Sequence, residues 1–478
     1  MNQLQLFLPC AAGVEDFLAQ EVHEITGLQG DDLRVMRGGV NLRSSWRDAM
    51  RLNLYSRLCQ RVLVQLHVGE YRNEQDLYKA ASDVAWEIWF TPKESFKIEI
   101  TAQHSPLQSL NFAALKIKDA IADRFRFKTG IRPDVNTQWP DARIYAHLTT
   151  DTATIYIDTS GEPLFKRGWR QDTGEAPLKE TLAAAMIAAS GWADTIYEEM
   201  GASGDNEPNF APFYDPCCGS GTIAIEAAQI ACNIAPGSTR RFGFEKLLPF
   251  QPHVWDAIKS EAAQAVLTPA ERTNIQIFGS DVSFRMVDFA TRNAERAGVA
   301  DVVQFRGGDA LQRMPPCENE KKNGIMIVNP PYGDRIGISG VAGQNARRSG
   351  GRENAQQHGQ QNPRQNANQN ANFNPDAGDF EQDNQAGQPD QPRFGQRETA
   401  QTENAGLEGS EFFPQLATHW KKNYAGWTAH VLTPDMKLPS KMRLKESRRV
   451  PMWNGPIECR LFRFDMVAGS ARTKPAQP

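Results

Sequence analysis

Two kinds of apolar pattern alternate along the first third of the chain. In Phe96–Ile100 apolar residues occupy every second position, which is typical of a half-buried strand. Over 112–125 they recur every three or four residues, which predicts an amphipathic helix. Further strands are predicted over 4–8, 40–42, 61–68, 143–148 and 152–158, and further helices over 14–22, 46–58 and 76–88. This part is therefore predicted to be α+β.

From residue 178 onward, short apolar runs alternate with helical patterns. Strands are predicted over 213–215, 275–281, 302–305, 325–328, 427–432 and 458–466, and helices over 178–190, 223–231, 284–297 and 412–420. Strands that alternate with helices favour a parallel α/β sheet. The turn-rich residues 159–176 lie between the two parts and are predicted to be a linker.

The strand predicted over 325–328 is followed by Asn329, Pro330, Pro331 and Tyr332. The prolines hold the chain extended at the carboxyl end of the strand, where open α/β sheets bind ligands. The Asn side-chain oxygen and the adjacent carbonyl can accept both hydrogens of an exocyclic amine, and the tyrosine ring can stack on the base. An ordinary Asn-Pro turn is the competing interpretation of this motif taken alone.

A second motif follows the strand predicted over 213–215. Asp215 ends that strand, and Gly219 and Gly221 lead directly into the helix predicted over 223–231. Glycines let the backbone approach a ligand closely, and a helix N-terminus offers free N–H groups. Tight packing of a strand against a helix would also explain a lone Gly-x-Gly.

Further acids strengthen the interpretation as a ligand site. Asp281 ends the next predicted strand and Asp309 follows the one after it, in the same order as the motifs above. Asp281 is suited to hold ribose hydroxyls, although it lies much more than ~20 residues beyond the glycines. Residues 237–269 between them are predicted to be an inserted segment.

Composition limits the class of protein. The chain has 478 residues, a net charge of -4 and seven cysteines without a Cys-x-x-Cys pair. Neither a disulfide framework nor a metal site is indicated, which fits a reducing cytoplasm. No apolar run reaches the ~20 residues of a membrane span, so we expect a soluble cytoplasmic protein.

Because the net charge is negative, any positively charged surface that binds a nucleic acid must be confined to part of the molecule. Cations that could track a phosphate backbone are Lys97, Lys116, Lys118, Arg124, Arg167 and Arg170, although solvated helix faces would look the same. From Glu411 onward the sequence contains 12 Lys and Arg and only 5 Asp and Glu, which makes this the most basic part of the chain. Residues 341–407 are rich in Asn and Gln and are predicted to be a disordered insertion.

Several stretches resemble the class I S-adenosylmethionine-dependent RNA methyltransferases that carry a THUMP domain. They resemble in particular the N-terminal half of the bifunctional 23S ribosomal RNA guanine-N2/N7 methyltransferases. The resemblance covers nearly the whole chain, and its most specific stretches are Gly38-Gly-Val, Ala114-Leu-Lys-Ile-Lys-Asp-Ala-Ile, Arg167-Gly-Trp-Arg, Glu175-Ala-Pro-Leu-Lys-Glu-Thr-Leu, Asp215-Pro-Cys-Cys-Gly-Ser-Gly-Thr and Asn329-Pro-Pro-Tyr-Gly.

This resemblance implies a domain order: a ferredoxin-like unit over 1–45, an RNA-binding THUMP domain over 46–158 and a seven-stranded Rossmann-like methyltransferase domain over 177–478. It implies S-adenosylmethionine as cofactor, with its methionine part near Asp215, Gly219 and Gly221, its ribose at Asp281 and its adenine at Asp309. Asn329, Pro330 and Tyr332 would hold a guanine of 23S rRNA. The second methyltransferase half of the bifunctional relatives is absent from this sequence, so only the N2 activity is expected.

Three alternatives remain open at this stage. The substrate could be a tRNA guanine, or an adenine N6 amine, because Asn-Pro-Pro-Tyr does not distinguish among amines. The chain could also be a non-catalytic RNA-binding assembly factor with a vestigial pocket.

Overall fold

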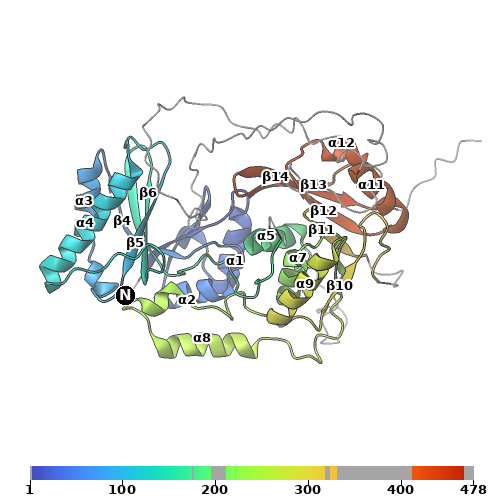
Figure 1. Ribbon diagram of the computed structural model, residues 1–478, viewed down its shortest axis with the longest axis horizontal. Coiled ribbons are helices and arrows are strands. Elements are labelled where there is room, and N and C mark those ends of the chain that lie inside the picture. The colour runs from blue at the N-terminus through green and yellow to red at the C-terminus, as the bar shows by residue number, and fades with distance from the viewer. Residues whose placement is uncertain (1–2, 175–176, 195–210, 318–322, 331–411, 468–478) are drawn as a thin grey trace, which may run out of the picture. The chain divides into compact units, whose positions relative to one another are not determined.

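The computed structural model describes residues 3–174, 177–194, 211–317, 323–330 and 412–467 (Figure 1). Contacts divide these residues into two units. The first unit contains the described residues up to Gly168 together with Ala235–Ala265, and the second contains the remaining ones. Among the described residues, no helix is long and apolar enough to cross a membrane.

The first unit is built on one seven-stranded sheet. Its strand order is β2 (Leu33–Met36), β3 (Gly39–Ser44), β1 (Leu4–Pro9), β4 (Leu63–Glu70), β7 (Thr152–Asp158), β6 (Ala142–Leu148) and β5 (Phe96–Ala102). Neighbouring strands are antiparallel except β5 and β6. The predicted α+β class is therefore confirmed for this part of the chain.

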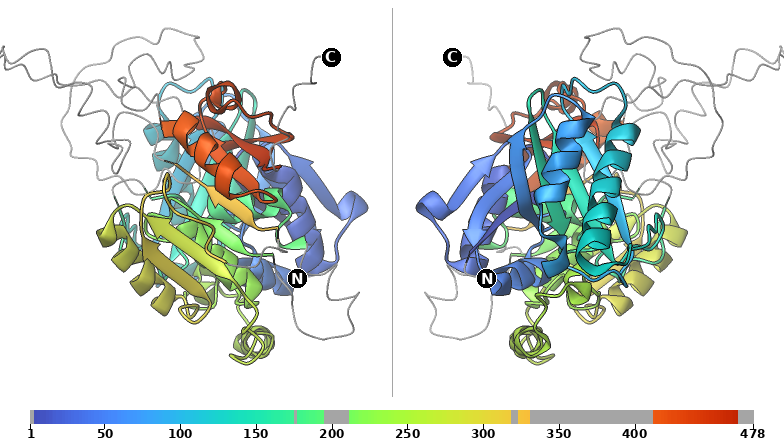
Figure 2. Two further views of the ribbon diagram at one scale, coloured as in Figure 1. Left: turned by 90° about the vertical axis from the view of Figure 1, so that its right-hand side faces the viewer. Right: turned by 90° about the vertical axis from the view of Figure 1, so that its left-hand side faces the viewer.

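The described residues of the first unit also form helices. They are α1 (Glu15–Thr26), α2 (Trp46–Tyr55), α3 (Glu74–Asp83), α4 (Leu110–Thr129) and α8 (Pro252–Gln264), with 3-10 turns η1 (Gly30–Asp32), η2 (Trp86–Ile88) and η3 (Gly243–Lys246). α3 and α4 pack side by side over one face of the sheet (Figure 2). α4 buries Ile117, Ile121 and Phe125, and Ser109 Oγ caps its N-terminus by accepting from the Phe112 amide.

Residues 235–265 return to the first unit, although they lie between two strands of the second. The Gly237 amide donates to the Leu54 carbonyl at 3.0 Å, and the Phe244 amide donates to the Thr159 carbonyl at 2.8 Å. The Arg240 guanidinium donates to the carbonyls of Ser160, Glu162, Pro163 and Lys166. These bonds attach the segment 235–265, which makes up most of the insertion predicted over 237–269, to the first unit.

The second unit is built on a mixed seven-stranded sheet. Its strand order is β10 (Val303–Gly307), β9 (Ile277–Asp281), β8 (Phe213–Asp215), β11 (Ile325–Val328), β12 (Thr428–Thr433), β14 (Ile457–Asp465) and β13 (Arg448–Asn454). The first five strands pair in parallel, and β14 is antiparallel to both of its neighbours. The predicted Rossmann-like fold with seven strands is confirmed.

Helices cover both faces of this second sheet. They are α5 (Glu180–Ser190), α7 (Thr222–Ala231), α9 (Phe284–Arg296), α11 (Phe412–Asn423) and α12 (Leu438–Met442). Met326 and Val328 of β11 pack in one apolar cluster with Leu416 and Trp420 of α11. α5 contacts β11 as well, and all three of Met326, Ile327 and Val328 are fully buried, so both faces of the strand are covered. That explains why β11 is an uninterrupted apolar run in the sequence.

Candidate active site

The order of strands in the second unit brings the predicted site residues to one edge. β8 lies between β9 and β11, and both neighbours are parallel to it. The chain therefore leaves all three strands at the same edge, at Asp215, Asp281 and Asn329. Strand order reverses direction at β8, and a crevice at such a switch point is where open α/β sheets bind ligands.

Asp215 is a buried carboxylate at the end of β8. Its side chain is 1% exposed, and Oδ1 accepts a hydrogen bond from the Cys217 amide at 3.2 Å. Burial raises the pKa of Asp215 well above its usual value, and the neighbouring charge of Asp281 raises the pKa further. A buried acid with a perturbed pKa beside a ligand edge is a candidate for a functional residue.

The two glycines after Asp215 have different roles. Both have a positive φ, 52° at Gly219 and 88° at Gly221. A Cβ on Gly221 would lie 2.9 Å from Ala290 Cβ and 2.9 Å from Phe305 Cζ, so this glycine allows close packing inside the unit. A Cβ on Gly219 would meet nothing within 4 Å, so the backbone there is open to an approaching ligand.

Asp281 connects the ends of three strands. Its Oδ2 accepts from the Gly219 amide at 3.0 Å and its Oδ1 accepts from the Ser283 amide at 2.9 Å. Its own carbonyl accepts from the Gly308 amide at 2.9 Å, one residue before Asp309. Burial raises the pKa of Asp281. The predicted sugar-binding acid thus lies directly beside the glycine loop, despite its distance in the sequence.

Asn329 lies at the end of β11, next to β8. Its side-chain Oδ1 is buried and has no hydrogen-bond partner among the described residues. A buried acceptor without a partner is costly, so a ligand donor at this atom would relieve that cost. Pro330 is buried, whereas the predicted site residues Pro331 and Tyr332 lie outside the described residues.

Two of the arginines that were predicted to contact RNA form hydrogen bonds within the protein instead. The guanidinium of Arg124 donates both Nε and Nη2 to the carboxylate of Glu87, and Nη1 to the Ser82 carbonyl. Arg167 is 1% exposed and donates to the carbonyls of Leu164 and Arg57. These contacts assign both arginines a structural role in the first unit and argue against the expected RNA contact.

The remaining RNA candidates differ in how their charges are used. Lys97 pairs with Glu99 at 3.3 Å and Lys118 pairs with Asp119 at 2.8 Å. Lys116 has no acidic partner among the described residues, and its Nζ lies 5.4 Å from the ring centroid of the exposed Phe112. The Arg170 guanidinium is hydrogen-bonded within the second unit, where its Nη2 donates to Glu180 at 2.6 Å. Lys116 is therefore the candidate whose charge is most available.

Residues around the glycine loop that sequence patterns did not assign are Glu180, Thr222 and Asn293. Glu180 is buried and holds Arg170, which also donates to Thr222 Oγ1 at 3.3 Å. Asn293 on α9 is fully buried and donates to the Ser220 carbonyl at 3.0 Å. The only signal in the sequence was that Glu180 and Thr222 belong to stretches that resemble the family.

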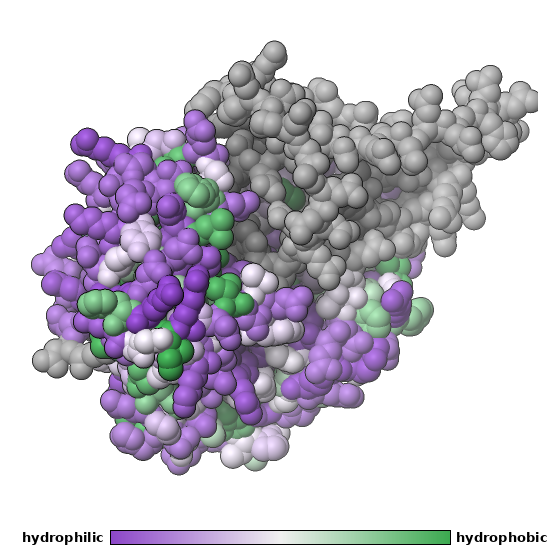
Figure 3. Space-filling view, turned by 60° about the vertical axis from the view of Figure 1, so that its left-hand side comes forward, coloured by the Kyte–Doolittle hydropathy of each residue, from purple (hydrophilic) through white to green (hydrophobic). Residues whose placement is uncertain are grey.

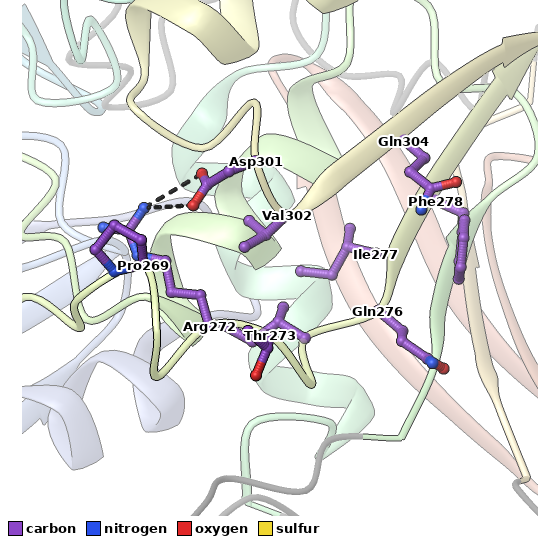
Figure 4. A pocket seen from close by; sticks show the side chains of 10 residues that line it. Pro269, Arg272, Thr273, Gln276, Ile277, Phe278, Asp301, Val302 and Gln304 are labelled. Carbon is purple, nitrogen blue, oxygen red and sulfur yellow. Dashed lines mark hydrogen bonds and ion pairs between the residues drawn. The ribbon is translucent and has the colours of Figure 1, made fainter.

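A separate depression lies at the opposite ends of the strands (Figure 4). Its volume is about 340 Å³, and its lining includes Arg272, Gln276, Asp301 and Gln304. Arg272 and Asp301 form an ion pair of 3.3 Å across it. β9 begins here and ends at Asp281, so this depression is distinct from the candidate active site.

Comparisons with protein families divide the chain into three matched parts. Residues 5–63 match the RlmL ferredoxin-like domain, residues 71–158 match the THUMP domain, and residues 167–361 match the "RMKL-like, methyltransferase domain". The division at residue 45 proposed from the sequence remains a prediction.

Curated relatives match almost the whole chain. The ribosomal RNA large subunit methyltransferase K/L of Psychromonas ingrahamii is 32% identical over 99% of this chain and 52% of the relative. The protein of the same name from Shewanella amazonensis is 32% identical over 98% of this chain and 54% of the relative. The chain thus spans about half the length of these relatives.

Solved structures share the fold. SMU.472, crystallised in complex with SAH, superposes with a TM-score of 0.71 at 24% identity and covers 98% of this chain and 100% of that one. A protein from Listeria monocytogenes, titled an N6-adenine-specific DNA methylase, gives 0.70 at 24% identity with 97% and 96% coverage. TrmN from Thermus thermophilus gives 0.56 at 14% identity with 97% and 100% coverage. The resemblance stated from the sequence is confirmed: the chain matches, in this order, the RlmL ferredoxin-like domain, the THUMP domain and the RMKL-like methyltransferase domain.

Proposed function

We propose that this protein transfers a methyl group from S-adenosylmethionine to the N2 amine of a guanine in 23S rRNA, in the cytoplasm. The proposal rests on the buried Oδ1 of Asn329 at the switch point, beside the glycine loop that follows β8, because this atom has no hydrogen-bond partner in the described part of the chain. The large-subunit rRNA methyltransferases that match the chain, and its THUMP domain, support RNA as the substrate.

The residues at the edge of β8 and β9 fit S-adenosylmethionine. The open face above Gly219 admits the methionine part, and the carboxylates of Asp281 and Asp309 supply acceptors for ribose and adenine. The cofactor would supply an electrophilic methyl group. SAH in the related SMU.472 structure agrees with this assignment.

Asn329 would position the nucleophile. Its side-chain oxygen and a neighbouring main-chain carbonyl can each accept one hydrogen of the guanine NH2 group, which orients the nitrogen lone pair. Once methylated, that nitrogen is cationic and acidic, so acceptors suffice and a strong general base is not required. The base must leave its helical stack to reach such a pocket.

RNA would be held mainly by charge. The side that Figure 3 brings forward is mostly hydrophilic, with apolar residues in separate spots. Exposed cations in the C-terminal part of the second unit include Lys421, Lys422, Lys437, Arg443, Lys445, Arg448 and Arg449. Lys421 Nζ donates to the Arg443 carbonyl at 2.8 Å, which brings the ends of α11 and α12 together. None of these cations has an acidic partner within the described part of the chain.

The test is methyl transfer from labelled S-adenosylmethionine to purified, unmodified 23S rRNA, followed by nucleoside analysis. We expect label in N2-methylguanosine from 23S rRNA and none from tRNA. Label in tRNA guanine, or in N6-methyladenosine, would replace the proposed substrate with one of the alternatives. Binding of RNA without any transfer would indicate a non-catalytic assembly factor.

A further inference from the structure

The segment Trp169–Asp172, where the second unit begins, is anchored to that unit by buried polar contacts. Arg170 Nη2 donates to Glu180 Oε2 at 2.6 Å, and the side chains are 11% and 2% exposed. Arg170 Nη1 donates to the Leu178 carbonyl at 2.7 Å and to Thr222 Oγ1 at 3.3 Å. One guanidinium thus joins the segment, the start of α5 and the first residue of α7.

Asn293 makes a second connection from α9. Its Nδ2 donates to the Asp172 carbonyl at 2.9 Å and to the Ser220 carbonyl at 3.0 Å, and its Oδ1 accepts from the Gln171 amide at 3.3 Å. Arg296 Nη2 donates to Asp172 Oδ2 at 2.6 Å. The side chain of Asn293 is fully buried, and the hydrogen bonds at both Nδ2 and Oδ1 give its amide one orientation.

These contacts hold Ser220 and Thr222, the residues on either side of Gly221. Glycine is conformationally permissive, so a glycine loop keeps one shape only when its neighbours fix it. Asp281 Oδ2 accepts from the Gly219 amide at one end of the loop, and Arg170 and Asn293 restrain the residues on either side of Gly221. A site is precise when the groups behind it are locked in this way.

We propose that Arg170 and Asn293 are positioning residues that fix the loop Gly219–Thr222 in the shape that binds the cofactor. This inference rests on the proposed function, in which that loop holds S-adenosylmethionine. It also replaces RNA contact as the role of Arg170, since its guanidinium donates to Leu178, Thr222 and Glu180, which all lie within the second unit.

Arg170→Lys and Thr222→Val test the proposal on the full chain, with cofactor binding measured without RNA and RNA binding measured separately. Lysine keeps the charge but cannot bridge Glu180 and Thr222 together, and valine removes only the hydroxyl with little change of shape. We expect each to raise the Kd of S-adenosylmethionine in calorimetry, about tenfold for Arg170→Lys. Thr222→Ser, which restores the hydroxyl, should recover wild-type affinity.

Arg292→Lys is the matched control. Arg292 precedes Asn293 on α9, and its guanidinium pairs with Asp172 at 3.3 Å and with Asp288 at 2.8 Å, neither of which belongs to the glycine loop. Its cofactor affinity should equal that of the wild type. In hydrogen exchange without cofactor, the amides of Gly219–Thr222 should exchange faster in Arg170→Lys than in Arg292→Lys.

The possible outcomes separate the alternatives. Normal cofactor affinity and normal loop exchange in Thr222→Val and Arg170→Lys would overturn the positioning role. Unchanged cofactor affinity with weaker RNA binding in Arg170→Lys would restore the RNA-contact role and overturn the proposal. If the wild type bound no S-adenosylmethionine, the proposed function would fail, while faster loop exchange in Arg170→Lys would still support the restraint. Should Arg170→Lys not fold, Thr222→Val alone decides.

Discussion

The main-chain amide of Gly219 donates a hydrogen bond of 3.0 Å to Asp281 Oδ2. This bond joins the loop after β8 to the end of β9, across 62 residues of sequence. One carboxylate oxygen thus holds the glycine loop, while the other accepts from the Ser283 amide. The acid assigned to the ribose therefore also shapes the loop assigned to the methionine part of the cofactor.

Asp281→Ala should weaken cofactor binding strongly. It removes the acceptor of the Gly219 amide and a ribose acceptor, and a hydrogen bond to a charged group contributes about 1.5–3 kcal/mol. We expect the Kd of S-adenosylmethionine to rise at least tenfold in calorimetry. Asp301→Ala, which removes a carboxylate at the other end of the sheet, should leave that Kd unchanged; an equal effect in both variants would refute the local role.

The two glycines should respond differently to alanine. Gly221→Ala combines a positive φ of 88° with contacts of 2.9 Å to Ala290 and Phe305, so it should destabilise the fold by several kcal/mol. Gly219→Ala has only the strain of its φ of 52°, about 1–2 kcal/mol, because nothing lies within 4 Å. Thermal unfolding measures this difference. A larger loss of Tm in Gly219→Ala would contradict the assigned roles.

Asp215→Asn should change how stability depends on pH. Burial raises the pKa of Asp215 in the folded protein, whereas in the unfolded chain its pKa is about 3.9. The folded state then binds the proton more tightly, so the stability from this group is complete at low pH and is lost as pH rises through the folded pKa. Asparagine removes that loss.

We therefore expect Asp215→Asn to gain stability relative to the wild type between about pH 4 and neutral pH, measured as the difference in Tm across that range. Asp288→Asn, which removes an exposed carboxylate from α9, is the control for loss of one negative charge. A constant difference in Tm between Asp215→Asn and the wild type at all pH values would contradict the prediction.

Lys116 and Arg124 should have opposite phenotypes although both lie on α4. Lys116→Ala should leave stability unchanged and lower the salt dependence of RNA binding by about one unit, as expected for one phosphate contact. Arg124→Ala should instead lower stability by about 1 kcal/mol, because it breaks the bidentate pair with Glu87. Filter binding across a salt series, together with thermal unfolding, measures both effects. A reduced salt slope in Arg124→Ala alone would reverse the assignment.

The sequence predicted the elements of the second sheet where local signals agree. Ile325–Val328 is a short apolar run that ends at Asn-Pro-Pro, and Gly219 precedes an apolar helix, so strand and loop were both predictable. β13 was missed because Pro451 and adjacent arginines weaken the strand pattern. β13 is an edge strand, and there a proline and positive charges are tolerated.

Partners distant in sequence account for what could not be predicted. Arg124, Arg167 and Arg170 look alike as cations, and only the fold places Glu87, Leu164 and Glu180 against them. The packing role of Gly221 likewise depends on Ala290 and Phe305, which a sequence pattern does not reveal. The roles of Pro331 and Tyr332 remain predictions from their motif.

Asn329→Ala tests the central claim most directly, with methyl transfer to 23S rRNA and S-adenosylmethionine affinity measured on the same preparation. Removing Oδ1 should abolish transfer to the guanine N2 amine while the Kd of the cofactor stays within about twofold of the wild type, because Asp215, Asp281 and the glycine loop are untouched. Asn323→Ala, at the other end of β11, should retain full activity. Full activity in Asn329→Ala would contradict the assignment of this residue as the acceptor that positions the amine.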